Sequence, residues 1–159
     1  MRIEQRDMLH AAATPGLAGG ARMREATMDR IPRPPAVLII DDDPDLLDLL
    51  QLFMQELVPT YDIIVMRDAH SALPHLTQRT VPLVITDYMM PGMNGLQLTA
   101  VTKAASPMTH VILATAYGSA ALEQRAREQG VDTVLPKAVL FDRLEDVVRS
   151  VLRLASVQE

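Results

Sequence analysis

The sequence contains no cysteine and no tryptophan, and aromatic residues make up only 3% of it. The lack of cysteine excludes disulfides and thiolate metal sites, and it fits the reducing cytoplasm, where we expect this protein. The scarcity of aromatic residues argues against a stacking surface for single-stranded nucleic acid. No apolar run approaches membrane-spanning length, and the N-terminus lacks the apolar core of a secretion signal, so we expect no contact with a membrane.

Positive charge is also scarce outside the first 35 residues. The whole chain has a formal net charge of −5, whereas residues 1–35 contain six arginines and four acidic residues. The first 35 residues are therefore weakly basic and the remainder is acidic. Because phosphate contacts need clustered lysine and arginine, we expect no direct DNA binding by the acidic part.

The first 35 residues also differ in composition from the rest of the chain. Residues 11–21 are rich in alanine and glycine, and the run Arg33-Pro34-Pro35 is stiff and extended. We predict a flexible N-terminal leader over residues 1–35 and one globular domain over residues 36–155.

Short apolar segments alternate with helical patterns throughout that domain. Strands are predicted at residues 37–41, 62–67, 83–87, 110–115 and 133–135, and helices at 45–57, 69–79, 94–105, 119–129 and 140–154. All the strands but the second are nearly continuous aliphatic or β-branched runs, which is typical of parallel strands covered on both faces. Five strand–helix pairs with short connections predict an α/β fold with a five-stranded, doubly wound parallel sheet and five helices.

Details within the helices refine their boundaries. Pro44 suits the first position of its helix, Pro74 should kink the second helix or shift its start, and Gly130 suits a C-cap. The inward stripe of the first helix is predicted to hold Leu46, Leu49, Leu50 and Phe53. That of the last helix is predicted to hold Leu144, Val147, Val148, Val151 and Leu152.

Polar residues follow four of the predicted strands. They are Asp41, Asp42 and Asp43 at the end of the first strand, Asp87 at the end of the third, Thr115 at the end of the fourth and Lys137 after the fifth. Function in such sheets lies at the carboxyl ends of the strands. Carboxylates gathered there would repel one another, so a cation is needed, and Mg²⁺ prefers oxygen ligands and phosphate.

A lysine and a hydroxyl at the same edge suit a phosphoryl group, and the remaining carboxylate can act as the nucleophile. Taken singly, each residue has a simpler explanation: Asp43 as an N-cap, Asp87 as a turn residue, Thr115 as an ordinary strand residue and Lys137 as a solvated lysine. These explanations do not account for their joint occurrence at the ends of four strands.

Four segments resemble the receiver domain of response regulators in two-component systems. They are VLIIDDDP at residues 37–44, LVITDYMMPGMNG at 83–95, VILATA at 111–116 and PK at 136–137, within a similarity that runs from about residue 36 to 154. The resemblance implies a flavodoxin-like sheet with strand order 2-1-3-4-5. It also implies a phosphorylation-dependent switch rather than an enzyme acting on other molecules.

In this family, an aspartate accepts a phosphoryl group from a histidine kinase, from a histidine phosphotransfer domain or from a small phosphate donor. The resemblance assigns that role to Asp87. It further implies that Mg²⁺ is bound by Asp42 directly, by Asp41 largely through water, by Asp87 and by the backbone carbonyl of Met89. Lys137 would pair with a phosphoryl oxygen, and Thr115 would move to donate a hydrogen bond to the phosphoryl group.

The sequence departs from the family pattern at two positions near the lysine. The family usually has a cis-proline after it, whereas Ala138 stands here, so we expect either a trans bond with a shifted loop or strain. Three positions before the lysine, the usual aromatic switch residue is replaced by Val134. We therefore expect activation to be communicated by the loop around Thr115–Gly118 or through a dimer interface.

Two bulky residues, Met89 and Tyr117, are expected to flank the path of water towards a phosphoryl group on Asp87. Neither orients water well, so we predict slow self-dephosphorylation. No output domain is recognised after residue 154, so we expect output by contact with a downstream protein or a second copy of the chain. We expect this contact on the face of the fourth helix, fifth strand and fifth helix.

Two other functions remain open at this stage. One is a receiver-like interaction scaffold that works without phosphorylation, which the departures at Val134 and Ala138 favour. The other is a haloacid-dehalogenase-like phosphatase, because Asp41-Asp42-Asp43 contains a spaced aspartate pair after an apolar strand. That alternative leaves Asp87 and its Pro-Gly-Met-Asn-Gly loop unexplained.

Overall fold

The computed structural model describes residues 31–153. Contacts divide the chain into two units, Met1–Arg33 and Pro34–Glu159, and all the helices and strands named in this section belong to the second unit. Most of the predicted leader lies outside the described residues. Within the described part of the chain, no helix is both long enough and apolar enough to span a bilayer.

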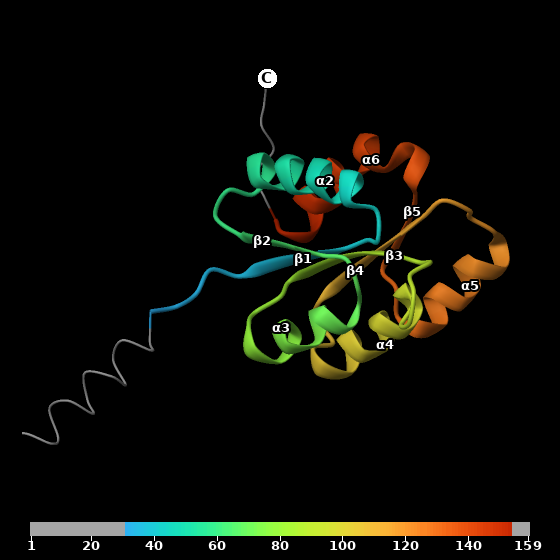
Figure 1. Ribbon diagram of the computed structural model, residues 1–159, viewed down its shortest axis with the longest axis horizontal. Coiled ribbons are helices and arrows are strands. Elements are labelled where there is room, and N and C mark those ends of the chain that lie inside the picture. The colour runs from blue at the N-terminus through green and yellow to red at the C-terminus, as the bar shows by residue number, and fades with distance from the viewer. Residues whose placement is uncertain (1–30, 154–159) are drawn as a thin grey trace, which may run out of the picture. The chain divides into compact units, whose positions relative to one another are not determined.

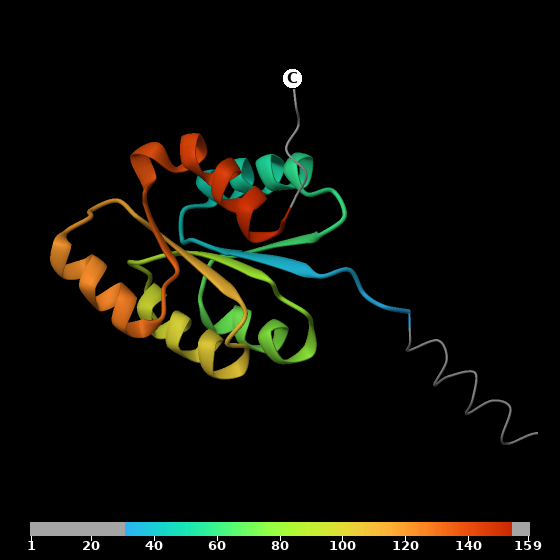
Figure 2. The same ribbon diagram turned by 180° about the vertical axis from the view of Figure 1, so that it is seen from behind.

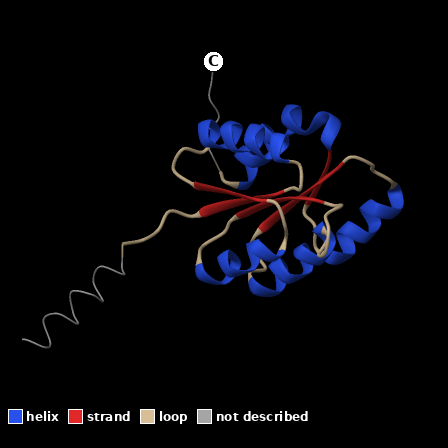
Figure 3. Cartoon of the chain, in the orientation of Figure 1, coloured by secondary structure: helices blue, strands red, loops and turns tan. Residues whose placement is uncertain are grey.

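The centre of the domain is a five-stranded sheet in which every neighbouring pair is parallel. Its strands are β1 (Ala36–Ile40), β2 (Asp62–Met66), β3 (Leu83–Asp87), β4 (His110–Thr115) and β5 (Thr133–Pro136). Their order is β2-β1-β3-β4-β5. The predicted doubly wound, flavodoxin-like sheet is therefore confirmed (Figure 3).

Five helices cover the two faces of the sheet. They are α2 (Pro44–Leu57), α3 (Leu73–Gln78), α4 (Gly95–Ala105), α5 (Ala120–Gln129) and α6 (Leu140–Val151). Helices α2 and α6 lie on one face, and α3, α4 and α5 lie on the other (Figures 1 and 2). This two-sided cover explains why β1, β3 and β4 are almost wholly buried and apolar.

The helix starts that border the functional edge are fixed by side-chain caps. Asp43 accepts hydrogen bonds from the backbone N–H groups of Asp45 and Leu46. Asn94 and Gln97 form a reciprocal capping box at the start of α4. Ser119 caps α5, which ends at Gly130 with φ +92°. Because each of these helices starts at its cap, the loops between the strands and the helices are short.

Two predictions about helices are refined by the packing. The second helix starts late, because a 3₁₀ turn (His70–Ala72) precedes Leu73 and Pro74 occupies the first turn. The prediction that Leu49 faces inward is wrong, since it is 56% exposed. Leu47, Leu50 and Met54 form the buried stripe of α2 instead. Leu46 and Phe53 pack at its margin, so the true stripe is rotated away from Leu49.

Candidate functional site

Three carboxylates converge at the carboxyl edge of the sheet. β1 and β3 are neighbours, with Ile40 paired to Thr86, so the residues that follow β1 lie beside the end of β3. Asp41, Asp42 and Asp87 can each offer an oxygen, and these oxygens lie within 4.8 Å of one another. Among residues 31–153, no other group of His, Cys, Asp or Glu side chains meets this condition.

The three carboxylates differ in their access to solvent. Asp41 and Asp87 are only 2% and 6% exposed, whereas Asp42 is exposed. Oδ1 of Asp41 accepts a hydrogen bond from the backbone N–H of Asp43 at 2.9 Å, which orients it inside the turn. Asp43 caps α2, so the N-cap explanation of this residue is confirmed.

Lys137 lies between the two buried carboxylates. Its Nζ is 2.7 Å from Oδ2 of Asp41 and 3.3 Å from Oδ1 of Asp87. Pairing of Thr115 with Pro136 at the end of β5 brings the lysine to this edge, and a 3₁₀ turn (Lys137–Val139) follows. No peptide bond among the described residues is cis, so the bond before Ala138 is trans.

The charges of this cluster are unbalanced, and the pKa values reflect this. Burial raises the pKa of Asp87 above its ordinary value, and the negative charge of Asp41 raises it further, against the opposing effect of Lys137. Burial alone would lower the pKa of Lys137, but its hydrogen bond and ion pair with Asp41 raise it overall. The carboxylate of Asp87 is therefore more basic than a solvated one.

Thr115 is buried at the end of β4, but its hydroxyl is held by its own loop. Oγ1 donates to the carbonyl of Tyr117 at 3.1 Å and accepts from the N–H of Tyr117 at 3.2 Å. Thr115 must release the Tyr117 carbonyl before it can donate to any group on Asp87.

A cavity of about 250 Å³ opens above Asp87. It is lined by Asp87, Tyr88, Met89, Thr115, Ala116, Tyr117 and Lys137. Met89 and Tyr117 are 67% and 86% exposed. These two exposed side chains line the cavity together with the carboxylate of Asp87.

Three residues that contact the acidic residues of this edge were not predicted as site residues from the sequence. The hydroxyl of Thr86 donates to the carbonyl of Asp87 at 3.0 Å, and Arg67 Nη2 donates to the carbonyl of Asp42 at 3.5 Å. A Cβ on Gly95 would lie 2.2 Å from the carbonyl oxygen of Asp87, so only glycine fits there. Gly95 belongs to a quoted motif, whereas no pattern in the sequence indicated the contacts of Thr86 and Arg67.

The residues present fit Mg²⁺. The three carboxylates that converge offer only oxygen, two of them are buried, and the single lysine beside them does not neutralise their charge. Hard divalent cations prefer such donors, and Mg²⁺ in particular combines one or two carboxylates with water and phosphate oxygens. Asp41, Asp42 and Asp87 are therefore the residues that would hold it.

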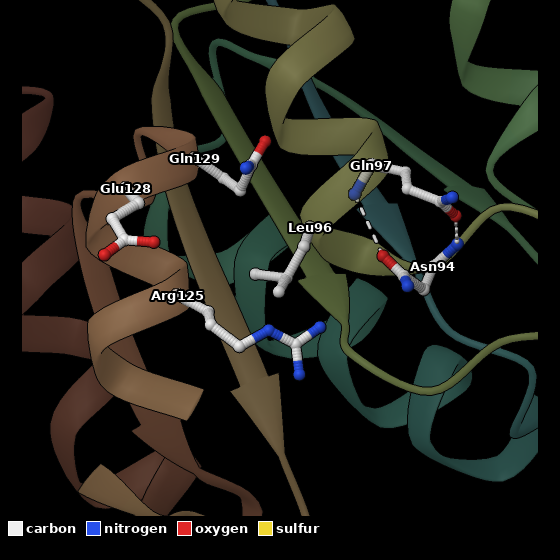
Figure 4. A pocket seen from close by; sticks show the side chains of 6 residues that line it. All are labelled: Asn94, Leu96, Gln97, Arg125, Glu128 and Gln129. Carbon is white, nitrogen blue, oxygen red and sulfur yellow. Dashed lines mark hydrogen bonds between the residues drawn. The ribbon is translucent and has the colours of Figure 1, made fainter. Parts of the chain in front are cut away.

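A second cavity, of about 320 Å³, lies between α4 and α5. Figure 4 shows Arg125, Glu128 and Gln129 on α5 and the capping pair Asn94 and Gln97 at the start of α4, with Leu96 between the helices. This cavity brings together no cluster of carboxylates or nucleophiles. Its wall is instead part of the contact between the two helices.

Comparisons with known proteins agree with this geometry. The family model of the response regulator receiver domain matches residues 37–149. Sporulation initiation phosphotransferase F of Bacillus subtilis (strain 168) is 31% identical over 121 residues, which cover 76% of this chain and 95% of that protein. Transcriptional regulatory protein GlrR of Escherichia coli (strain K12) is 35% identical over 120 residues, covering 76% of this chain but only 27% of that protein.

Solved structures show the same architecture. The signal receiver domain of a DNA binding response regulator protein (merR) from Colwellia psychrerythraea 34H superposes with a TM-score of 0.70 and 26% identity, covering 75% of this chain and 98% of that one. The signal receiver domain of an HD domain-containing protein from Pseudomonas fluorescens Pf-5 gives 0.66 and 31%, covering 76% and 96%. With the family match spanning the sheet, the helices and the acidic edge, this chain belongs to the response regulator receiver domain family.

Proposed function

We propose that this protein is a phosphorylation-dependent signalling switch that accepts a phosphoryl group on Asp87 in the presence of Mg²⁺. The observation that carries the proposal is the position of Asp87. Its buried carboxylate lies beside two further carboxylates and Lys137, below an open cavity. A nucleophile, a cation-binding group and a positive side chain are the elements that phosphoryl transfer requires.

An Asp87 carboxylate oxygen attacks phosphorus, and the bond from phosphorus to the donor breaks. The electron pair goes to the leaving nitrogen of a phosphohistidine, or to the leaving oxygen or nitrogen of a small donor. Lys137 moves from the carboxylates towards a phosphoryl oxygen, and Thr115 donates to another. When bound, Mg²⁺ neutralises charge on the phosphoryl oxygens.

The proposed donors and targets are proteins. A histidine kinase or a histidine phosphotransfer domain supplies the phosphoryl group, and the output is contact with a downstream protein or a second copy of the chain. The match to nearly the whole of a sporulation phosphotransferase supports a role in phosphoryl relay. The chain spans only about a quarter of the length of the transcriptional regulators that it matches. We therefore do not propose that this chain regulates transcription as they do.

We further propose that the protein has no enzymatic activity beyond its own phosphorylation and a slow self-dephosphorylation. The exposed side chains of Met89 and Tyr117 beside the cavity support slow loss of the phosphoryl group from Asp87, because neither acts as a base or firmly orients water. After removal of the donor, the phosphorylated protein should persist for minutes or longer with Mg²⁺ present. Decay within seconds, followed by intact mass, would contradict this.

The direct test is incubation with Mg²⁺ and acetyl phosphate or phosphoramidate, followed by intact mass measurement. We expect a gain of one phosphate, lost with EDTA and lost in Asp87→Asn. Asp48→Asn serves as the matched control, because Asp48 is an exposed aspartate on α2. Phosphate on Asp87→Asn, or none on the wild-type protein with any donor, would contradict the proposal.

The scaffold that works without phosphorylation is the second candidate, favoured by Val134 and Ala138. It predicts that the wild-type protein takes up no phosphate yet binds its partner equally well after Asp87→Asn. The receiver family match over residues 37–149 argues against the phosphatase alternative.

A further inference from the structure

Tyr88 contacts both the acceptor site and the layer of helices beneath it. The residue follows Asp87 directly and lines the cavity above it. Its half-buried side chain also packs against an apolar cluster under α4 and α5, which we call the α4–α5 cluster. The cluster consists of Leu96, Leu113, Leu122, Ala126 and Val131. Figure 4 shows Leu96 of this cluster between the two helices.

The backbone of Tyr88 is held on both sides. Its N–H donates to the carbonyl of Ala114 at 3.1 Å, next to Thr115 on β4, and its carbonyl accepts from the N–H of Gly95 at 2.9 Å, at the start of α4. With its main chain anchored in this way, Tyr88 can respond to a change at the site only through its ring or through the side chains that pack on that ring.

No other aromatic side chain among the described residues bridges these two regions. Tyr117 is 86% exposed. Phe53 and Phe141 pack edge to face on each other, with ring centroids 5.6 Å apart, and Tyr61 joins the core cluster with Phe53. Val134 borders the α4–α5 cluster but has no ring. The one ring at the junction of site and cluster therefore belongs to Tyr88.

The loop after Thr115 couples this junction to α5. In the described state, the Thr115 hydroxyl holds the backbone of Tyr117 through two hydrogen bonds. Two residues later Ser119 caps α5, and Leu122 in the first turn of that helix belongs to the α4–α5 cluster. If Thr115 turns to a phosphoryl group on Asp87, this loop loses its anchor and Leu122 is free to repack against Tyr88.

We propose that Tyr88 is a positioning residue that passes the state of the acceptor site to α5, through its contact with the α4–α5 cluster. This inference rests on the proposed phosphorylation of Asp87. Tyr88 thus connects the cavity with the α4–α5 cluster. Val134 cannot make this connection, because valine has too little surface to reach both.

The test is amide hydrogen exchange over residues 116–123, with and without phosphoramidate and Mg²⁺. We compare wild type, Tyr88→Leu, Tyr88→Phe and the control Tyr61→Leu, which makes the same change on the other face of the sheet. Intact mass reports phosphate uptake separately. We expect Tyr88→Leu to take up phosphate but to lose about half or more of the phosphate-induced change in exchange. Tyr88→Phe and Tyr61→Leu should retain it.

A full phosphate-induced change in phosphorylated Tyr88→Leu would overturn the inference and leave the proposed function intact. Uptake of phosphate by Tyr88→Phe but not by Tyr88→Leu would also overturn it, because Tyr88 would then act on the acceptor itself. No uptake by the wild type would remove the proposed function, and this inference with it. If thermal unfolding shows that Tyr88→Leu is not folded, Tyr88→Met is read by the same criteria.

Discussion

The two edges of the sheet use the same kind of ion pair in different ways. At the amino edge, Lys103 Nζ lies 2.7 Å from Asp132 Oδ2 and 2.6 Å from the carbonyl of Thr109. Asp132 also accepts the N–H of Val111 at 2.8 Å. At the carboxyl edge, Lys137 faces two buried carboxylates, and a third lies close by.

The difference shows that the ion pair at the amino edge serves stability, whereas the groups at the carboxyl edge are arranged for chemistry. In the Lys103–Asp132 pair one positive charge meets one negative charge, and the remaining contacts go to backbone groups, so that this network joins α4, β4 and β5. The carboxyl edge has an excess of negative charge that another cation can relieve. Four predictions test this comparison, from the largest expected effect to the smallest.

Replacement of a glycine at each edge should have the largest effect. At Gly95 a new Cβ would lie 2.2 Å from the Asp87 carbonyl oxygen and 2.7 Å from Leu113, so Gly95→Ala should lower the free energy of unfolding by about 3 kcal/mol or more. Gly130→Ala should cost roughly 1–2 kcal/mol, because its φ is +92° and its nearest contact is the flexible Lys103 side chain. Urea unfolding measures both, with Gly118→Ala, which meets nothing within 4 Å, as control. Equal losses at Gly95 and Gly118 would contradict the described contact.

Removal of the lysine should be rescued by Mg²⁺ at one edge only. Lys137→Met leaves two buried carboxylates facing each other and should lower stability by about 2 kcal/mol without metal. Lys103→Met should cost about 1 kcal/mol. Denaturant unfolding with EDTA or with Mg²⁺ measures the difference. Mg²⁺ should restore most of the loss in Lys137→Met and none in Lys103→Met, and equal rescue of both would contradict the charge comparison.

Replacement of one carboxylate at each edge should change stability in opposite directions. Because the pKa of Asp87 is raised, its contribution to stability is present below its ordinary value of 3.8 and lost as pH rises through the raised pKa. Asp87→Asn should therefore raise the free energy of unfolding at pH 7 in EDTA by on the order of 1 kcal/mol, with the gain fading as pH falls through the raised pKa towards 3.8. Asp132→Asn should lower it at pH 7. Thermal unfolding across this pH range measures both, and a destabilised Asp87→Asn would contradict the imbalance.

The smallest effect should come from His110, at the amino edge. Burial lowers the pKa of this half-buried histidine from its ordinary 6.5, and the nearby Lys103 lowers it further against the opposing charge of Asp132. The unfolded chain then binds the proton more readily, so stability should fall as pH drops below 6.5. His110→Gln should reduce the total loss of stability at low pH by less than about 1 kcal/mol, because solvent screens a half-exposed group. The free energy of unfolding of both proteins is measured between pH 7.5 and 5.5, around the ordinary pKa of histidine. Identical slopes against pH for the wild type and His110→Gln would contradict this prediction.

Most of the sheet was predictable because its strands are buried on both faces and read as continuous apolar runs. The strands differ from the predicted ranges by one residue at some ends, and Asp41 follows β1 rather than ending it. The stripe of α2 was harder to predict. Leu46, Leu47, Leu49 and Leu50 are chemically alike, and only packing against β2 and α6 selects Leu47 and Leu50 as the buried pair.

By itself the sequence determined which residues stand at the strand ends, because parallel strands and short caps leave few alternatives for Asp41, Asp87, Thr115 and Lys137. Only the tertiary structure decided how these side chains are paired. Lys137 lies closer to Asp41 than to Asp87, Thr115 bonds to its own loop, and Tyr88 reaches from the cavity to the α4–α5 cluster. Such pairings join residues far apart in the chain, and they depend on distances and burial that local patterns do not contain.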